Sequence, residues 1–198
     1  MNTSLELRGN CIFHLNEVQD KKKTLIRSQS FTNPITNWQE MSYSIASYAT
    51  RIAKKLREDK LVAKRLRVFM HTSLFNDINL GYFGSDTISL FPPTNATHRI
   101  IEVALNLAQS IWRNGFKYKR AGLHMLDLEG ESLQENLFYT KEDLVNDMQI
   151  MKVLDDINHL MGSGTIHFAS SGFLKTRRQL TKSPCYTTNW NELRVLDF

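Results

Sequence analysis

The sequence predicts an α+β fold, in which a four-stranded sheet carries two helices on one face and is followed by a small, mostly helical or irregular C-terminal domain. Several short segments alternate apolar and polar residues, which indicates strands. Two longer segments repeat apolar residues at helical spacing. The order along the chain is strand, helix, strand, strand, helix, strand, which is typical of a ferredoxin-like split βαβ layer with one open sheet face.

The first strand is predicted over residues 21–32, KKKTLIRSQSFT. Leu25 and Phe31 share one parity and can face a core, whereas Ser30 and Thr32 share the other parity. Small hydroxyls beside backbone N–H groups and cations suit phosphate oxygens. An ordinary edge strand that lysines protect against aggregation would have a similar sequence.

Both helices have apolar stripes and N-terminal signals. Pro34 is expected to end the first strand, and Thr36 with Gln39 three residues later forms a capping-box pattern for the first helix. The second helix is expected to be capped by Thr97 or Asn95. The predicted buried positions are Met41, Ile45, Tyr48, Ala49, Ile52 and Leu56 in the first helix and Ile100, Ile101, Ala104, Leu107, Ala108 and Ile111 in the second.

Three further strands are predicted over residues 65–71, 86–91 and 118–126. The strand over 86–91 is expected to stop at the Pro92-Pro93 pair. Gly115 is expected to end the second helix in a left-handed conformation. The open sheet face should then collect basic, small and hydroxylated side chains, which suit a phosphate backbone better than a hydrophobic partner. These residues are Ser30, Thr32, Arg67, His71, Ser89, Arg120, Gly122 and His124.

Composition places the chain among soluble globular proteins. Of its 198 residues, 41% are hydrophobic and no apolar run approaches the roughly 20 residues of a membrane-spanning helix. The start has no secretory signal pattern, and Cys11 and Cys185 give neither a disulfide framework nor metal-ligand spacing, so we expect a cytoplasmic protein with no membrane partner. The net charge of +5 is uneven, with a basic block over 21–67 that is densest over 51–67 and an acidic block over 127–156, which favours polyanion binding by the first block. Residues 51–60 taken alone are interpreted as a solvated helix face.

Residues 127–140 lack periodicity and are interpreted as an acidic linker. The linker contains the adjacent apolar residues Leu137 and Phe138, which form either a contact to a neighbouring domain or a short motif that docks into another protein. Thr140 is then expected to cap a helix that Gly162 and Gly164 end. The final segment is at a size where a single core is marginal, so we expect it to be partly loose or to need a partner.

Several strings resemble the C-terminal part of UmuC-type catalytic subunits of DNA polymerase V, which are translesion DNA polymerases of the Y family. They are RSQSF at 27–31, PTNATHRIIEVALNLAQSIWRNGFKYKRAG at 93–122, QENLF at 134–138 and SPCYTTNWNEL at 183–193. The resemblance implies a lead-in from the polymerase core over residues 1–20, a little-finger DNA-binding domain over 21–129, a clamp-binding linker over 130–140 and a UmuC-type C-terminal domain over 141–198.

The resemblance also implies function. The expected DNA contacts are Arg27, Ser30, Thr32, Arg67, His71, Lys119, Arg120 and His124, and the expected sliding-clamp contacts are Gln134, Leu137 and Phe138. The partners would be duplex primer-template DNA, the sliding clamp and, less directly, a processed UmuD-type accessory subunit and the recombinase filament. The carboxylates that bind Mg²⁺ for nucleotidyl transfer belong to the family's palm domain, so this chain alone is not expected to be an enzyme or to hold a cofactor.

Two other functions share part of this pattern. An RNA-recognition module has the same strand order and stacks bases on sheet aromatics, but the K/R-G-F/Y-G/A-F-V-x-F/Y string is absent and Phe69 alone would be its platform. The chain could instead serve only for protein interaction, with Tyr186 and Trp190 at the centre of the contact. Preference for single-stranded RNA over duplex DNA would favour the RNA-recognition module, and an intact chain without nucleic-acid affinity would favour the protein-interaction function.

Overall fold

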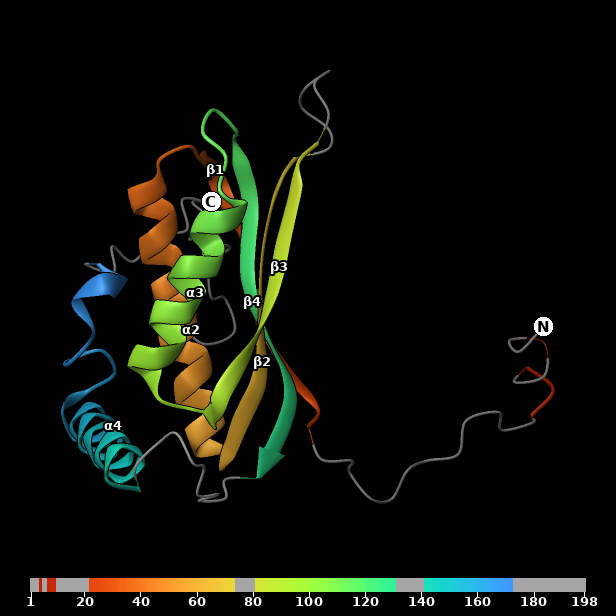
Figure 1. The fold of residues 1–198 in the computed structure, drawn as a ribbon. Helices are drawn as coiled ribbons and strands as arrows, with labels where there is room; N and C mark the ends of the chain where they lie inside the picture. The colour runs from red at the N-terminus through yellow and green to blue at the C-terminus, as the bar shows by residue number, and fades with distance from the viewer. Residues whose placement is uncertain (1–3, 5–6, 10–21, 74–80, 131–140, 173–198) are drawn as a thin grey trace, which may run out of the picture.

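The computed structural model describes residue 4 and residues 7–9, 22–73, 81–130 and 141–172. Within these ranges lie four strands, three long helices and a short 3-10 helix (Figure 1). In chain order they are β1 (Thr24–Ile35), α2 (Trp38–Glu58), β2 (Leu61–Thr72), β3 (Phe83–Thr94), α3 (Thr97–Ile111), β4 (Tyr118–Gly130), α4 (Lys141–Met161) and η1 (Ala169–Ser171).

The four strands form one antiparallel sheet in the order β1-β4-β2-β3. Strands β1 and β2 are therefore parallel and separated by β4, and β3 and β4 are parallel and separated by β2. Each helix connects one such separated pair, so the sheet consists of two interleaved split β-α-β units. Both α2 and α3 cover the same face, as Figure 1 shows with the sheet seen nearly edge-on, and the predicted fold is confirmed.

The core lies between the sheet and α2 and α3. Every predicted apolar position of α2 is buried, as are those of α3 before Ile111. Leu66, Val68 and Met70 of β2 are fully buried opposite Leu123 and Met125 of β4. The two periodicities, 3.6 in the helices and 2 in the strands, were therefore sufficient to locate this core.

All four strands run further than the sequence indicated, and β2 begins at Leu61 instead of at residue 65. β1 passes through Pro34 to Ile35, and β3 passes through Pro92 and Pro93 to Thr94. Both are edge strands, where a residue without an N–H group removes no ladder hydrogen bond on the open side. β4 continues to Gly130, so residues 127–130 belong to the sheet rather than to the expected linker.

The helix ends also differ from the predicted ones. Asn37, not Thr36, caps α2, and its side chain accepts a hydrogen bond of 2.9 Å from the Gln39 N–H. Ala96 occupies the N-cap of α3 with no side-chain bond to the helix, so neither Thr97 nor Asn95 is its cap. α3 ends at Ile111, and Gly115, with φ of 87°, lies in the turn beyond it rather than at the helix end.

An aromatic cluster closes the end of the core from which β4 starts. The Trp112 ring stacks on Tyr118 with 4.6 Å between ring centroids and packs on Trp38 at 5.5 Å. Tyr82, just before β3, packs on Phe116 at 5.1 Å and donates a hydrogen bond to the Ile111 carbonyl. The cluster therefore fixes the beginning of β3 against the helix layer.

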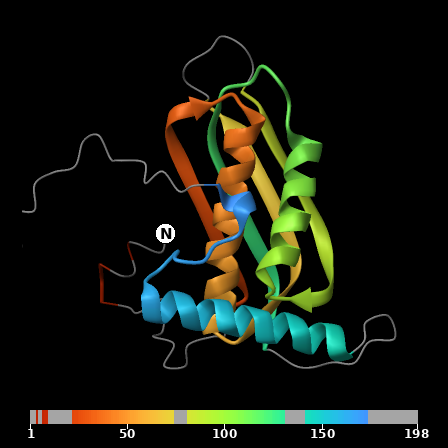
Figure 2. The same ribbon diagram turned by 90° about the vertical axis from the view of Figure 1, so that its left-hand side faces the viewer.

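A third layer lies outside the helices, where α4 crosses the ends of α2 and α3 and η1 rests on α2 (Figure 2). Met151 is the buried apolar anchor of α4, and its sulfur lies 3.4 Å from the Thr97 N–H. Gly162 and Gly164 have positive φ just after α4, as predicted for its end. Among the described residues, no helix is long and apolar enough to cross a membrane.

Candidate nucleic-acid interface

The open face of the sheet is a grid of four rows, and each row takes one side chain from every strand. Directly paired residues of neighbouring strands share a face, so the strand register defines the rows without any further assumption. In the strand order β1, β4, β2, β3 they are Thr24-Leu126-Arg65-Ser89, Ile26-His124-Arg67-Thr87, Ser28-Gly122-Phe69-Ser85 and Ser30-Arg120-His71-Phe83. We call this surface the open-face grid.

The centre of the grid is flat because Gly122 has no side chain. A Cβ atom built on Gly122 would lie 2.6 Å from the tip of the Phe69 ring and 2.4 Å from the Ser28 Cβ. The ring of Phe69 therefore extends from β2 across β4, over the glycine. Phe69 is thus used within the sheet and is only partly exposed.

Two arginines of the grid are held by hydroxyl groups. Arg67 donates from Nη2 to the Ser85 Oγ at 2.9 Å, and Arg120 donates from Nη2 to the Ser28 Oγ at 2.9 Å. Within the described part of the chain, neither guanidinium forms an ion pair with a carboxylate. Each keeps its full positive charge and most of its N–H groups for another acceptor.

The first row of the grid is electrostatically different. Arg65 is paired with Asp127, which raises the pKa of the guanidinium and lowers that of the carboxyl. Lys64, its neighbour in the chain, is paired with Glu129 at 2.5 Å. Unneutralised positive charge is therefore concentrated in the second and fourth rows, around Arg67 and Arg120.

His124 lies beside Arg67 in the second row. Burial lowers the pKa of its ring, and the nearby Arg67 guanidinium lowers it further. The Nε2 atom is buried and has no hydrogen-bond partner among the residues that the structure describes. The ring is therefore neutral at pH 7 and adds no charge to the grid.

The structure brings five of the eight predicted DNA-contacting residues into the grid and places three outside its rows. Ser30, Arg67, His71, Arg120 and His124 are in the rows. Arg27 pairs with the buried Leu123, so its side chain starts on the helix side at an exposed sheet edge. Thr32 follows the last paired residue of that stretch, and its carbonyl accepts a hydrogen bond of 3.1 Å from Lys119 Nζ.

Sequence reasoning missed Ser28, Ser85 and Phe83. The polar alternation that identified Ser89 continues backwards through Thr87 and Ser85 to Phe83. It was hidden because Gly84 and Asp86 occupy the intervening positions, where a core-facing strand normally has apolar residues. A Cβ on Gly84 would lie 2.6 Å from the Tyr82 hydroxyl, so the Tyr82 side chain occupies the space that a side chain of Gly84 would need.

The predicted clamp contacts Gln134, Leu137 and Phe138 lie outside the described residues. In the described ranges, no group of three or more His, Cys, Asp or Glu side chains could hold a metal ion. The open-face grid presents cations, hydroxyls and aromatic rings.

Residues 22–137, more than half of the chain, match the impB/mucB/samB family C-terminal domain. The chain belongs to that family. Residues 148–196 match a domain of unknown function, DUF4113.

Family members similar to this chain include two curated proteins. Protein UmuC of Salmonella typhimurium is 34% identical over 196 residues, which are 96% of this chain and 46% of that protein. Protein MucB of Escherichia coli is 32% identical over 196 residues, which are 98% of this chain and 46% of that protein. The resemblance to UmuC-type chains is thus confirmed, and the chain spans about half the length of these relatives.

Among solved structures, a complex of the β-clamp processivity factor and the little finger domain of PolIV contains a similar chain. The match has a TM-score of 0.42 and 16% identity, and it covers 59% of this chain and 99% of that one.

Proposed function

We propose that this chain is the DNA-holding and clamp-docking portion of an error-prone translesion DNA polymerase that acts in SOS repair and mutagenesis. The observation that carries the DNA-holding part is the open-face grid, in which Arg67 and Arg120 are positioned by serines rather than neutralised by carboxylates. Family membership supports the polymerase context. The catalytic carboxylates and their Mg²⁺ would belong to the family's palm domain.

The grid suits the phosphate backbone of a duplex. Its hydroxyls and guanidinium N–H groups are donors of the kind that position a protein on phosphate oxygens without reading sequence. None of its sixteen members is a carboxylate that would repel a polyanion. A translesion polymerase has to hold DNA of any sequence, and a surface that reads only the backbone meets that requirement.

A salt titration of duplex binding tests this function. Fluorescence anisotropy of a labelled primer-template duplex, at several salt concentrations, should give an affinity that falls steeply with salt. Replacing Arg67 and Arg120 together by glutamine should weaken binding at least tenfold and reduce the magnitude of the log-log slope by about 2, because each phosphate contact contributes about 0.9.

Arg65→Gln is the matched control, because Arg65 lies on the same face and is already paired with Asp127. Its loss should change both the affinity and the slope less than the loss of Arg67. Binding that does not depend on salt, or an equal effect of Arg65→Gln and Arg67→Gln, would contradict the proposed interface.

Clamp docking is the second part of the proposal. Gln134, Leu137 and Phe138 come a few residues after the end of β4 in the sequence and match the pattern through which polymerases of this type bind the sliding clamp. Replacing Leu137 and Phe138 together by alanine should abolish clamp binding in a pull-down with purified clamp and leave duplex affinity unchanged. A parallel loss of both activities would show that the two sites are not separate.

The remaining partners of the proposal are a processed UmuD-type accessory subunit and the recombinase filament. We propose residues 141–198 as the C-terminal domain and residues 21–129 as the little finger. The contacts of α4 with α2 and α3 then hold the C-terminal domain on the little finger, on the side away from the DNA-holding face.

A further inference from the structure

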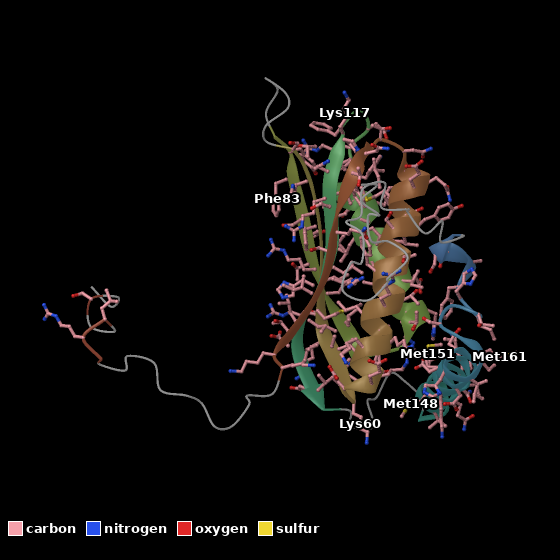
Figure 3. The ribbon with its side chains drawn as sticks, turned by 180° about the vertical axis from the view of Figure 1, so that it is seen from behind. Lys60, Phe83, Lys117, Met148, Met151 and Met161 are labelled. Carbon is pink, nitrogen blue, oxygen red and sulfur yellow. The ribbon has the colours of Figure 1, made fainter. Side chains whose placement is uncertain are left out.

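Phe83 is the feature of the open-face grid that phosphate binding does not explain. It belongs to the fourth row, with Arg120 and His71, yet 60% of its surface is exposed. Figure 3 shows it projecting from the side of the sheet opposite the helices, nearer to Lys117 than to Lys60. Phosphate oxygens gain nothing from an exposed phenyl ring.

Single exposed apolar residues are common on protein surfaces and usually have no function. Ile26 on the opposite edge of the same grid, 58% exposed, is such a residue. Phe83 differs from it because its ring is supported. The His71 ring stacks on it with 6.1 Å between centroids and 30° between planes.

The support is itself anchored. His71 Nδ1 lies 3.1 Å from the Thr72 carbonyl, which fixes the orientation of the imidazole. On the other side, the Thr72 N–H donates a hydrogen bond of 3.0 Å to the Tyr82 carbonyl, and the Tyr82 N–H donates one of 2.9 Å to the Thr72 hydroxyl. Tyr82, the residue before Phe83, is therefore held by the aromatic cluster, and the His71 ring beside Phe83 is held by the Thr72 carbonyl.

A rigid ring on a polar surface that also carries cations is an arrangement that binds an unpaired base. Bases of single strands stack on aromatic side chains whatever their identity, while nearby cations contact the backbone. Arg120 is two strands from Phe83, about 10 Å across the sheet. A few nucleotides bridge that distance, since successive bases of one strand rise about 3.4 Å in a duplex.

We propose that Phe83, supported by His71, is a stacking site for an unpaired base of the DNA strand that continues beyond the duplex. This inference rests on the proposed function, because the duplex held by Arg67 and Arg120 determines where the single strand leaves the grid. It adds a site for a nucleobase to a surface otherwise suited to phosphates.

The test compares two DNA probes on the full 198-residue chain. One is a blunt duplex, and the other is the same duplex with a single-stranded extension that carries 2-aminopurine. Phe83→Ala should weaken binding of the extended probe about tenfold and abolish quenching of its 2-aminopurine, while weakening binding of the blunt duplex far less. Phe83→Trp should retain both signals.

Two matched variants control for lost apolar surface. Ile26→Ala removes an equally exposed side chain that has no ring, and Phe91→Ala removes a ring of equal exposure, 60%, further along β3. Neither should alter the preference for the extended probe. All these side chains are exposed, so circular dichroism should show unchanged folding and melting for every variant.

The outcomes separate this inference from the proposed function. If the blunt duplex is bound in a salt-dependent way but Phe83→Ala affects both probes equally or neither, the stacking site is wrong and the duplex interface stands. If the chain binds no duplex at all, the proposed function is wrong. Tighter binding of a single-stranded RNA than of the extended DNA probe would overturn the assignment to DNA.

Discussion

The two outer surfaces of the molecule use arginine in opposite ways. On the open-face grid, Arg67 and Arg120 are held by the hydroxyls of Ser85 and Ser28. On the helix side, Arg57 binds both carboxylate oxygens of Asp155, at 2.6 and 2.9 Å, and also donates to the Asn95 carbonyl and the Thr97 hydroxyl at 2.9 Å. Arg57 is fully paired on the helix side, whereas Arg67 and Arg120 are available on the open-face grid.

The difference shows that the role of a cationic side chain is indicated by the group it is bonded to and not by the number of cations in the sequence. A bidentate carboxylate neutralises an arginine and fixes two elements together. Arg57 fixes α4 to α2, and Arg99 of α3 adds a second bridge of 2.7 Å to Asp147 of α4. A serine hydroxyl positions a guanidinium without removing its charge, which is what an anion-binding surface requires.

The largest effect expected from this comparison concerns Arg57. Its side chain is only 13% exposed, so Arg57→Ala leaves Asp155 half-buried without a partner and removes four hydrogen bonds. We expect the free energy of unfolding to fall by about 3 kcal/mol, measured by urea denaturation. Duplex affinity at a temperature where the variant is folded should not change.

Arg51→Ala is the control for Arg57→Ala, because Arg51 is an exposed residue of the same helix. It should change the free energy of unfolding by no more than about 0.5 kcal/mol. A similar loss in both variants would mean that α4 is not held by the Arg57 contacts.

A smaller effect is expected at the centre of the open-face grid. Gly122→Ala places a methyl group 2.4 Å from the Ser28 Cβ, an atom fixed to the backbone, and 2.9 Å from the Arg27 carbonyl oxygen. The strands have to separate locally, and we expect a loss of about 2 kcal/mol in urea denaturation.

Gly130 provides the comparison within the same strand. A Cβ at Gly130 has no heavy atom within 4 Å, so Gly130→Ala should be neutral within about 0.5 kcal/mol. Equal effects of the two substitutions would assign the loss to strand flexibility instead of to the close approach of Phe69 and Ser28.

The fold could be predicted because two local periods determine it. The apolar stripe of α2 and the alternation of Leu66, Val68 and Met70 define core-facing positions without any tertiary information. Element ends were less accurate. Proline ends a strand only where the missing N–H is needed, and whether β1 and β3 are edges depends on strand order, which the periods do not encode.

The open-face grid could be predicted only in part. Alternation alone assigned Arg67, Arg120 and His124 to one face. It could not assign partners, and therefore could not tell the paired Arg65 from the available Arg67, because Asp127 was expected in a linker and lies in β4. It missed Phe83 because Gly84 interrupts the apolar half of the pattern. The Tyr82 side chain occupies the space that a side chain at this position would need.

The smallest effect expected is a pH dependence from His124. Burial and Arg67 lower the pKa of its ring below the ordinary value of 6.5, so the unfolded chain binds this proton more tightly than the folded protein does. The stabilisation is complete above pH 6.5 and is lost as the pH falls from there toward the pKa of the folded protein. The urea midpoint should therefore drop more between pH 7.5 and 5.5 in the wild type than in His124→Gln.

Arg67→Gln sharpens this measurement. The substitution removes the repulsion between the Arg67 guanidinium and the protonated His124 ring but not the burial of that ring. It should therefore reduce the pH dependence that His124 contributes without abolishing it. An unchanged pH dependence in Arg67→Gln would mean that the guanidinium does not act on the imidazole. The charge of Arg67, which is available whereas that of Arg57 is paired, would then have no measurable effect on His124.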